Sequence, residues 1–348
     1  MSHKEFSGNP RPNAIANWLL VMALMVFLMV VVGGITRLTE SGLSMVRWEP
    51  VRGTIPPLND AQWATEFQSY QTSPQYQLVN RHMSLGEFKA IYFWEYLHRL
   101  IGRLIGLAFA LPLLWFWVKK QIPRGYGPRL TALLALGGLQ GTIGWWMVAS
   151  GLVNNPAVSH LRLATHLLMA LFIMAGLLWT ALDLRALAKT GINHPARMIR
   201  AAVLVLAMLA LQLCYGAFVA GLDAGFAFAE WPLMGGKIFP DGVPLFTSFW
   251  QNVIDQPVVV QFIHRWYAWA VAGAILFLSQ RLRKRGEIGL AYGLIFIVLA
   301  QIGLGIATLY SGVFIPIAVG HQAMGALLLA MVVVAAHRLG SGRFNASN

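Results

Sequence analysis

Eight runs of mostly apolar residues, each long enough to cross a membrane as a helix, divide this 348-residue chain. A bilayer core of roughly 30 Å is crossed by about 20 helical residues. We place the helices at residues 15–36, 95–118, 129–149, 161–182, 198–220, 260–280, 289–310 and 318–338. These runs are too long for barrel strands and lack their alternation. The sequence therefore predicts an all-α polytopic membrane protein with eight transmembrane helices.

The charge of the chain agrees with a membrane protein rather than a nucleic-acid-binding one. Hydrophobic residues make up 57% of the chain and charged residues 11%, and the formal net charge is +13. Many of the basic residues fall on one side of the predicted bundle: Lys4, Arg11, Lys119, Lys120, Arg124, Arg129, Arg185, Lys189, Arg197, Arg200, Arg281, Arg283, Lys284, Arg285, Arg338 and Arg343. Such loops are typically cytoplasmic. We therefore expect both termini in the cytoplasm and no nucleic-acid partner.

The end of the first apolar run recurs in the second half of the chain. The stretch "GGITRLTESGLSMVRWEP" from Gly33 aligns without a gap with "GAFVAGLDAGFAFAEWPL" from Gly216, and the alignment pairs Trp48 with Trp231. Recurrence at long spacing indicates an internal repeat. The repeated glycines are either sites of close helix packing or positions that contact a ligand.

A second motif supports the same division into halves. The stretch "QGTIGWWMVASG" from Gln140 is similar to "QIGLGIATLYSG" from Gln301. The sequence therefore predicts two four-helix repeats, residues 1–190 and 191–348. Because each repeat holds an even number of spans, both have the same orientation, and an axis along the membrane normal would relate them. We expect two parallel four-helix repeats.

Four histidines fall near one end of the even-numbered runs: His98, His264 and His321 at the start of runs two, six and eight, and His166 one to two turns into run four. Even-numbered helices all enter from the outer side, so the four imidazoles are predicted to share one depth near that face. A single buried histidine is usually a hydrogen-bonded core residue. Four histidines that a repeat arranges in pairs indicate ligands.

One step of the repeat alignment leaves a choice between two histidines. Counted from Gln140 and Gln301, it is His160 that falls opposite His321, whereas a six-residue gap pairs "HLLMAL" at His166 with "HQAMGA" at His321. We choose His166, which lies deeper in its apolar run. The remaining histidines are expected to be solvated in loops or at helix ends: His3, His82, His194 and His337.

A pair of inward-facing imidazoles suits heme iron better than zinc or copper. Zinc and copper sites usually have more ligands, often cysteines. Heme iron needs only two axial ligands, and neutral imidazole is a suitable ligand for iron. The heme propionates need cations, and Arg99, Arg162 and Arg265 lie within four residues of a predicted ligand. The alternative for these arginines is that they extend toward the lipid headgroups.

The two halves differ at one acidic position. Glu95 stands three residues before His98, whereas Gln261 stands at the corresponding place in the second half. A carboxylate near a metal centre in a medium of low dielectric can exchange protons with a reacting group. We infer that the N-terminal half does chemistry and the C-terminal half holds a permanent cofactor. Alternatively, Glu95 forms an ion pair with Arg99 or Arg103.

Together these motifs resemble those of the heme A synthase family, in the branch shared by alphaproteobacteria and mitochondria. The resemblance rests on "GGITRLTESGLSM", "EYLHRLIGR", "QGTIGWWMVASGL", "RLATHL", "FIHRW" and "GHQAMGALLL", and it covers nearly the whole chain. It implies an oxidoreductase of the inner membrane that oxidises the C8 methyl group of heme O to the formyl group of heme A. The product serves cytochrome c oxidase.

The resemblance also implies roles for the residues. The family holds a heme b in its C-terminal half, which matches His264 and His321, and acts on the substrate heme in its N-terminal half, which matches His98 and His166. The acid of its Glu-x-x-His motif matches Glu95. Some bacterial relatives carry paired loop cysteines, but this chain has a single cysteine, Cys214. A mechanism that needs a loop disulfide is therefore excluded here.

Partners and surroundings follow as expectations from the same resemblance. The heme sites are expected toward the periplasmic side of a bacterial inner membrane, with a heme O synthase, oxidase assembly factors, an unidentified electron acceptor and a second copy of the chain as possible partners. Aromatic residues of the first outer loop either cap the site or form an interfacial belt: Trp48, Trp63, Phe67, Tyr70, Tyr76 and Tyr92.

Two other functional classes fit parts of the sequence. A di-heme electron-transfer cytochrome would also use paired histidines, but it has no need of an acid at only one pair. A transporter built from parallel repeats would explain the symmetry, yet it predicts broken helices and polar groups near the midplane. The Glu95 and Gln261 difference favours the enzyme.

Overall fold

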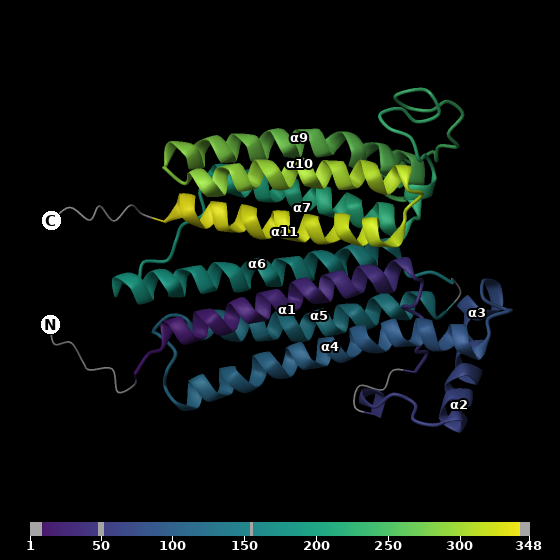
Figure 1. Cartoon of the computed structure of the whole chain (residues 1–348), viewed down its shortest axis with the longest axis horizontal. Coiled ribbons are helices and arrows are strands. Elements are labelled where there is room, and N and C mark those ends of the chain that lie inside the picture. Colours follow the sequence, from purple (N-terminus) through teal and green to yellow (C-terminus); the bar gives the residue numbers. More distant parts are fainter. Residues whose placement is uncertain (1–8, 48–51, 154–155, 342–348) are drawn as a thin grey trace.

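The computed structural model describes residues 9–47, 52–153 and 156–341. Eight of its helices are long and apolar enough to cross a membrane, and they lie side by side in one bundle (Figure 1). They are α1 (Pro12–Leu38), α4 (Leu85–Val118), α5 (Gly127–Gly151), α6 (His160–Thr190), α7 (Arg200–Gly221), α9 (Pro257–Lys284), α10 (Ile288–Tyr310) and α11 (Ile315–Gly340). The described residues form no β-strand. The predicted all-α membrane fold with eight spans is confirmed.

Shorter helices lie in the connections at one end of the bundle, which we call the loop end. They are η1 (Arg52–Thr54), α2 (Asp60–Gln71), α3 (Pro74–Leu78), η2 (Ala224–Phe226) and α8 (Phe249–Asp255). The opposite end, where α1 begins and α11 ends, is called the basic end (Figure 1). The first span therefore begins and the last span ends on the same side of the bundle, as an even number of spans requires.

Helix α4 begins at Leu85 rather than at residue 95, and this corrects the predicted place of one histidine. Its start is a capping box, in which the Ser84 hydroxyl accepts from the Glu87 amide while the Glu87 carboxylate accepts from the Ser84 amide. The first turns of α4, before residue 95, are too polar to be included in the apolar run from which the helix was predicted. His98 therefore lies well inside α4 and does not begin the helix.

The first and last spans of each half form the centre of the bundle. Helix α1 packs against α4, α6 and α11, and α6 also packs against α5, α7 and α11. The largest buried side chains at this centre include Ile15, Leu19, Met174 and Leu177. Helices α4 and α5 are the least buried of the eight. In a membrane these two helices would contact lipid over most of their surface.

A buried acid links both halves near the basic end. Asp183 of α6 accepts from Arg129 of α5 at 2.7 Å, from the Ala196 amide at 2.9 Å and from His337 Nε2 of α11 at 3.0 Å. The His337 ring also packs edge-on against Trp179. The expectation that His337 is solvated was wrong, because this last turn of α11 packs against α6 and the segment before α7. His82 and His194 are exposed as expected, and His3 lies outside the described residues.

We expect Asp183→Ala to destabilise the protein by about 2 kcal/mol, because it leaves buried His337 and partly exposed Arg129 without their common acceptor. Solvent around Arg129 keeps the loss below that of a fully buried pair. The thermal unfolding midpoint in detergent measures the effect. Asp60→Ala, on an exposed turn of α2, is the matched control. Equal midpoints for the two variants would contradict a linking role for Asp183.

Candidate functional site

Each of the four predicted histidine ligands lies against a glycine on the preceding transmembrane helix. In the first half, a Cβ added to Gly33 would lie 3.3 Å from His98 Nε2, and one added to Gly144 would lie 2.8 Å from His166 Cε1. A Cβ at Gly144 would force His166 to move, and one at Gly33 would be in tight contact with His98. The two glycines therefore allow the imidazoles of α4 and α6 to approach α1 and α5 closely.

The second half repeats the arrangement at the positions that the sequence alignment pairs. A Cβ on Gly216 would lie 3.1 Å from His264 Cε1, and one on Gly305 would lie 2.9 Å from His321 Cε1. Gly216 corresponds to Gly33, and Gly305 corresponds to Gly144. The glycines thus contact the histidines rather than serving helix packing alone.

Glutamine residues fix the orientation of three of the rings. The Gln140 amide lies 3.2 Å from His166 Nδ1 and donates to the His166 carbonyl at 3.0 Å, and Gln212 makes the same two contacts with His264, at 3.1 and 2.9 Å. In the fourth helix pair, His321 Nδ1 lies 3.1 Å from the Gln301 carbonyl. The carbonyl contact keeps the proton on His321 Nδ1 and leaves the lone pair of Nε2 for another partner, whereas an amide that donates to Nδ1 keeps the proton on Nε2.

The second-half histidines face each other across a gap that suits a single metal ion. The ring centroids of His264 and His321 are 6.4 Å apart, and the rings are perpendicular at 89°. Two metal–imidazole bonds of about 2 Å each would place the centroids about 6 Å apart. The described residues contain no group of three or more His, Cys, Asp or Glu that could hold a metal by themselves. Paired imidazoles are the donor set that heme iron uses.

The two histidine pairs lie on helices that pack differently. His98 and His166 are half-buried, as are His264 and His321. However, α9 packs against α11, whereas α4 packs against α1 and α5 and has at most marginal contact with α6. The helices of the first pair are therefore packed less closely against each other than those of the second.

Glu95 is buried and holds the segment that follows α1. One carboxylate oxygen accepts from the Ser44 hydroxyl at 2.6 Å and from the Met45 amide at 2.8 Å. The other oxygen forms an ion pair with Arg99 at 2.5 Å. Of the two arginines proposed as alternative partners, Arg99 makes this contact. Proton exchange by Glu95 remains a prediction.

The corresponding residues of the second half make a parallel set of contacts with an amide in place of the acid. Gln261 donates to the Phe228 carbonyl at 3.0 Å, and Arg265 donates to the same carbonyl at 2.6 Å. In the first half, Arg99 donates to the Met45 carbonyl at 3.0 Å. Met45 and Phe228 are equivalent in the repeat alignment. The two sites thus share their framework and differ in one ionisable group.

The three arginines predicted to bind propionates all have protein partners. Arg162 donates to the Trp146 carbonyl at 2.7 Å and lies over the Trp146 ring at 4.5 Å. Arg99 and Arg265 contact the backbone of the loops that follow α1 and α7. Among the described residues, Arg265 Nε has no partner although it is buried. Binding of propionates by these arginines remains a prediction.

Aromatic residues of the first outer loop form a small core of their own at the loop end. Tyr70 is fully buried, and burial raises its pKa, so its hydroxyl stays protonated and donates to Gln75 at 3.1 Å. Met45 belongs to this core and is also bonded to Glu95. Its other aromatic members are Trp63, Phe67, Tyr76, Phe88, Tyr92 and Tyr96. Trp48 lies outside the described residues.

The sequence interpretation missed several residues that shape the site. The sequence did not indicate a role for Ser44, because its hydrogen-bond partner Glu95 is 51 residues away along the chain. Gln140 and Gln301 open the repeated motif, and that repetition marked them as important without assigning a role. His166 rather than His160 makes the contacts equivalent to those of His321. His160 instead pairs with Asp255 at 3.1 Å, between the halves.

Known proteins with similar sequences cover nearly the whole chain. Residues 16–333 match the COX15-CtaA family, described as cytochrome oxidase assembly protein. A heme A synthase of Rhizorhabdus wittichii is 54% identical over 95% of this chain and 95% of its own length. The heme A synthases of Sphingopyxis alaskensis and Rhodospirillum centenum are 52% and 50% identical, over 95% and 94% of this chain and 93% and 89% of their own lengths.

Proposed function

The chain belongs to the heme A synthase family, and from that membership we propose that it oxidises the C8 methyl group of heme O to the formyl group of heme A. The relatives at 50–54% identity carry the name of this enzyme, and the matching family is one of cytochrome oxidase assembly. The product would be supplied to cytochrome c oxidase. The observation that carries the proposal is the pair of matched histidine sites with an acid at only one of them.

The C-terminal site is proposed to hold a resident heme b between His264 and His321. The 6.4 Å separation of the rings and the glycines beneath them fit axial ligation, and the contact of His321 Nδ1 with the Gln301 carbonyl leaves His321 Nε2 available as a ligand. The buried Nε of Arg265 is a donor that a propionate could use. When bound, heme b supplies one-electron transfer out of the reaction.

The N-terminal site is proposed to receive heme O between His98 and His166. Helices α4 and α5 are the least buried of the bundle, which supports entry of a large amphiphile from the bilayer. Gly33 and Gly144 leave the space that the two imidazoles occupy. Arg99 and Arg162 would orient the substrate through its propionates.

Glu95 is proposed to accept a proton released when the methyl group is oxidised. Its position three residues before His98 puts it on the same face of α4. Donors from Ser44, Met45 and Arg99 hold the carboxylate in one orientation. At the equivalent position, Gln261 cannot accept a proton, which agrees with a C-terminal site that only holds a cofactor.

We also propose that the basic end of the bundle lies in the cytoplasm. Its lysines and arginines follow the pattern of cytoplasmic loops. The four histidines and the aromatic core of the first loop then lie toward the periplasmic side of an inner membrane. Transfer of heme O from its own synthase, and of electrons to a separate acceptor, would complete the reaction.

Substitution of Gly144 tests whether the close glycine contacts matter for this reaction. We expect Gly144→Leu to lower heme O conversion by roughly tenfold or more, because overpacking costs about 1–3 kcal/mol and here displaces His166. Gly138→Leu on the same helix is the matched control, since a Cβ there meets nothing within 4 Å. Heme A formed per folded protein is the readout. Equal losses in both variants would contradict the contact.

A further inference from the structure

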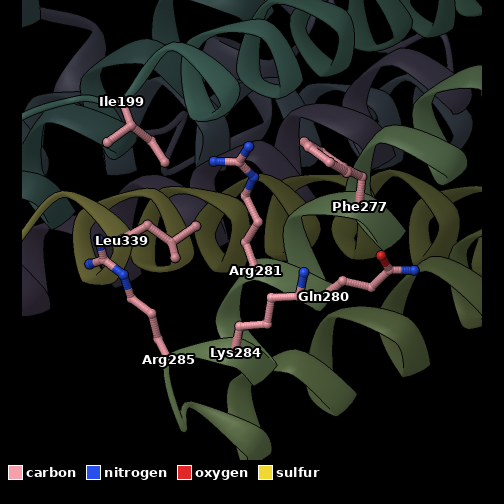
Figure 2. Close-up of a pocket in the computed structure, with 7 residues that line it drawn as sticks. All are labelled: Ile199, Phe277, Gln280, Arg281, Lys284, Arg285 and Leu339. Atoms are coloured by element: carbon pink, nitrogen blue, oxygen red, sulfur yellow. The ribbon is translucent and has the colours of Figure 1, made fainter.

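A pocket at the basic end lies away from both histidine pairs, between the ends of three helices. Arg281, Lys284 and Arg285 reach it from the last turn of α9. Ile199, at the start of α7, and Leu339, near the end of α11, form the opposite wall (Figure 2). No residue of the proposed reaction lines this pocket. The proposed reaction therefore does not account for this pocket.

The cationic side of the pocket comes from one face of one helix. Arg281, Lys284 and Arg285 are spaced i, i+3 and i+4, so their side chains project in the same direction. All three are exposed. Within the described part of the chain, none of them forms an ion pair with an acidic side chain. Three positive charges thus converge on the pocket without a protein counter-charge.

Two of these cations are positioned by neighbouring groups. The Arg281 guanidinium lies 4.8 Å from the centre of the Phe277 ring. Arg285 donates to the Arg338 carbonyl of α11 at 3.2 Å. These contacts use part of each guanidinium and leave further N–H donors available. The positive charge is therefore held at the pocket rather than spread freely into solvent.

The rest of the pocket lining is largely apolar, and within it Phe277 lies toward the membrane interior. Phe277 stands one turn before Arg281 on α9 and is 48% exposed. Ile199 is half-buried and Leu339 is buried. Cations at the helix end and an exposed aromatic ring one turn deeper match the two parts of a phospholipid. A free nucleotide or inorganic phosphate would use only the cationic part.

We propose that this pocket binds an anionic phospholipid, with the headgroup phosphate at Arg281, Lys284 and Arg285 and an acyl chain along Phe277. Basic pockets between transmembrane helices recognise acidic headgroups in this way. Basic residues that serve only to orient the bundle in the membrane could be scattered over its cytoplasmic end. They would not have to line a pocket shared by α7, α9 and α11. The lipid would join the ends of these helices within the C-terminal half.

Native mass spectrometry of the full chain in detergent, with phosphatidylglycerol or phosphatidylcholine added, tests the proposal. We expect the triple variant R281Q/K284Q/R285Q to bind phosphatidylglycerol at least roughly tenfold more weakly, with phosphatidylcholine unchanged. F277A is expected to weaken phosphatidylglycerol binding as well, while leaving all three charges in place. An unchanged thermal unfolding midpoint shows that each variant is folded.

The matched control carries the same charge change at the basic end of the N-terminal half. K119Q/K120Q/R124Q alters three exposed cations outside the pocket and is expected to retain phosphatidylglycerol binding. Equal loss in both triple variants would overturn the proposal, because binding would then follow net charge. Displacement of the lipid by inorganic phosphate at equal concentration would also overturn it, since the site would then recognise phosphate alone.

Discussion

Replacing Glu95 with glutamine is expected to lower heme O conversion by at least about a hundredfold, the usual contribution of a positioned proton acceptor. Glutamine keeps the size of the side chain, and its carbonyl oxygen can still accept from Ser44 and the Met45 amide. It cannot take up a proton, and its amide no longer neutralises Arg99. Heme A formed per folded protein, in cells that supply heme O, measures the effect.

Two further variants separate proton transfer from loop anchoring. Ser44→Ala removes the 2.6 Å hydrogen bond to Glu95 but keeps the carboxylate, and we expect conversion within about tenfold of the original protein. Gln261→Ala removes the equivalent anchor in the second half, and the loop after α7 stays fixed by Arg265. Conversion by Glu95→Gln at the level of Ser44→Ala would mean that the acid only anchors the loop.

Replacing His264 with alanine is expected to remove the resident heme b and, with it, heme O conversion. The centroid of its imidazole lies 6.4 Å from that of His321, and the described residues contain no group of three or more His, Cys, Asp or Glu that could hold a metal in its place. Loss of one of two axial ligands leaves the iron without a strong second donor. The absorbance spectrum of the purified protein and its extracted heme b content measure the result.

Controls for this prediction come from the same helices and from the surface. His321→Ala should lose heme b as His264→Ala does, whereas exposed His82→Ala should keep it. Gln212→Leu removes the contact with His264 Nδ1 and is expected to retain heme b with a shifted reduction potential. Full heme b content in both histidine variants would contradict its placement in the second half.

The number of spans could be predicted from the sequence because the apolar runs are as long as a bilayer is thick. Their ends were harder to place. Helix α4 starts earlier than predicted, at the capping box of Ser84 and Glu87. Its first turns therefore lie outside the apolar run. His337 was expected in solvent because it stands at a helix end, yet tertiary packing against Asp183 buries it. Hydropathy does not report such local partners.

The candidate site could be predicted to the extent that the repeat marked it. A short ungapped match paired His98 with His264 and revealed the difference between Glu95 and Gln261. Pairing His166 with His321 needed a six-residue gap. The contacts of Gly144 with His166 and of Ser44 with Glu95 join distant parts of the chain. No periodicity along the sequence encodes such pairs, and they become visible only in three dimensions.

Identification of the heme extracted from purified protein, expressed together with a heme O synthase, tests the central claim most directly. We expect heme A beside heme B in the original protein, and loss of heme A with retention of heme B in His98→Ala. Mass spectrometry and the pyridine hemochrome spectrum distinguish the two products. Heme B alone, at two per chain and with no heme A, would contradict the account and make the protein an electron-transfer cytochrome.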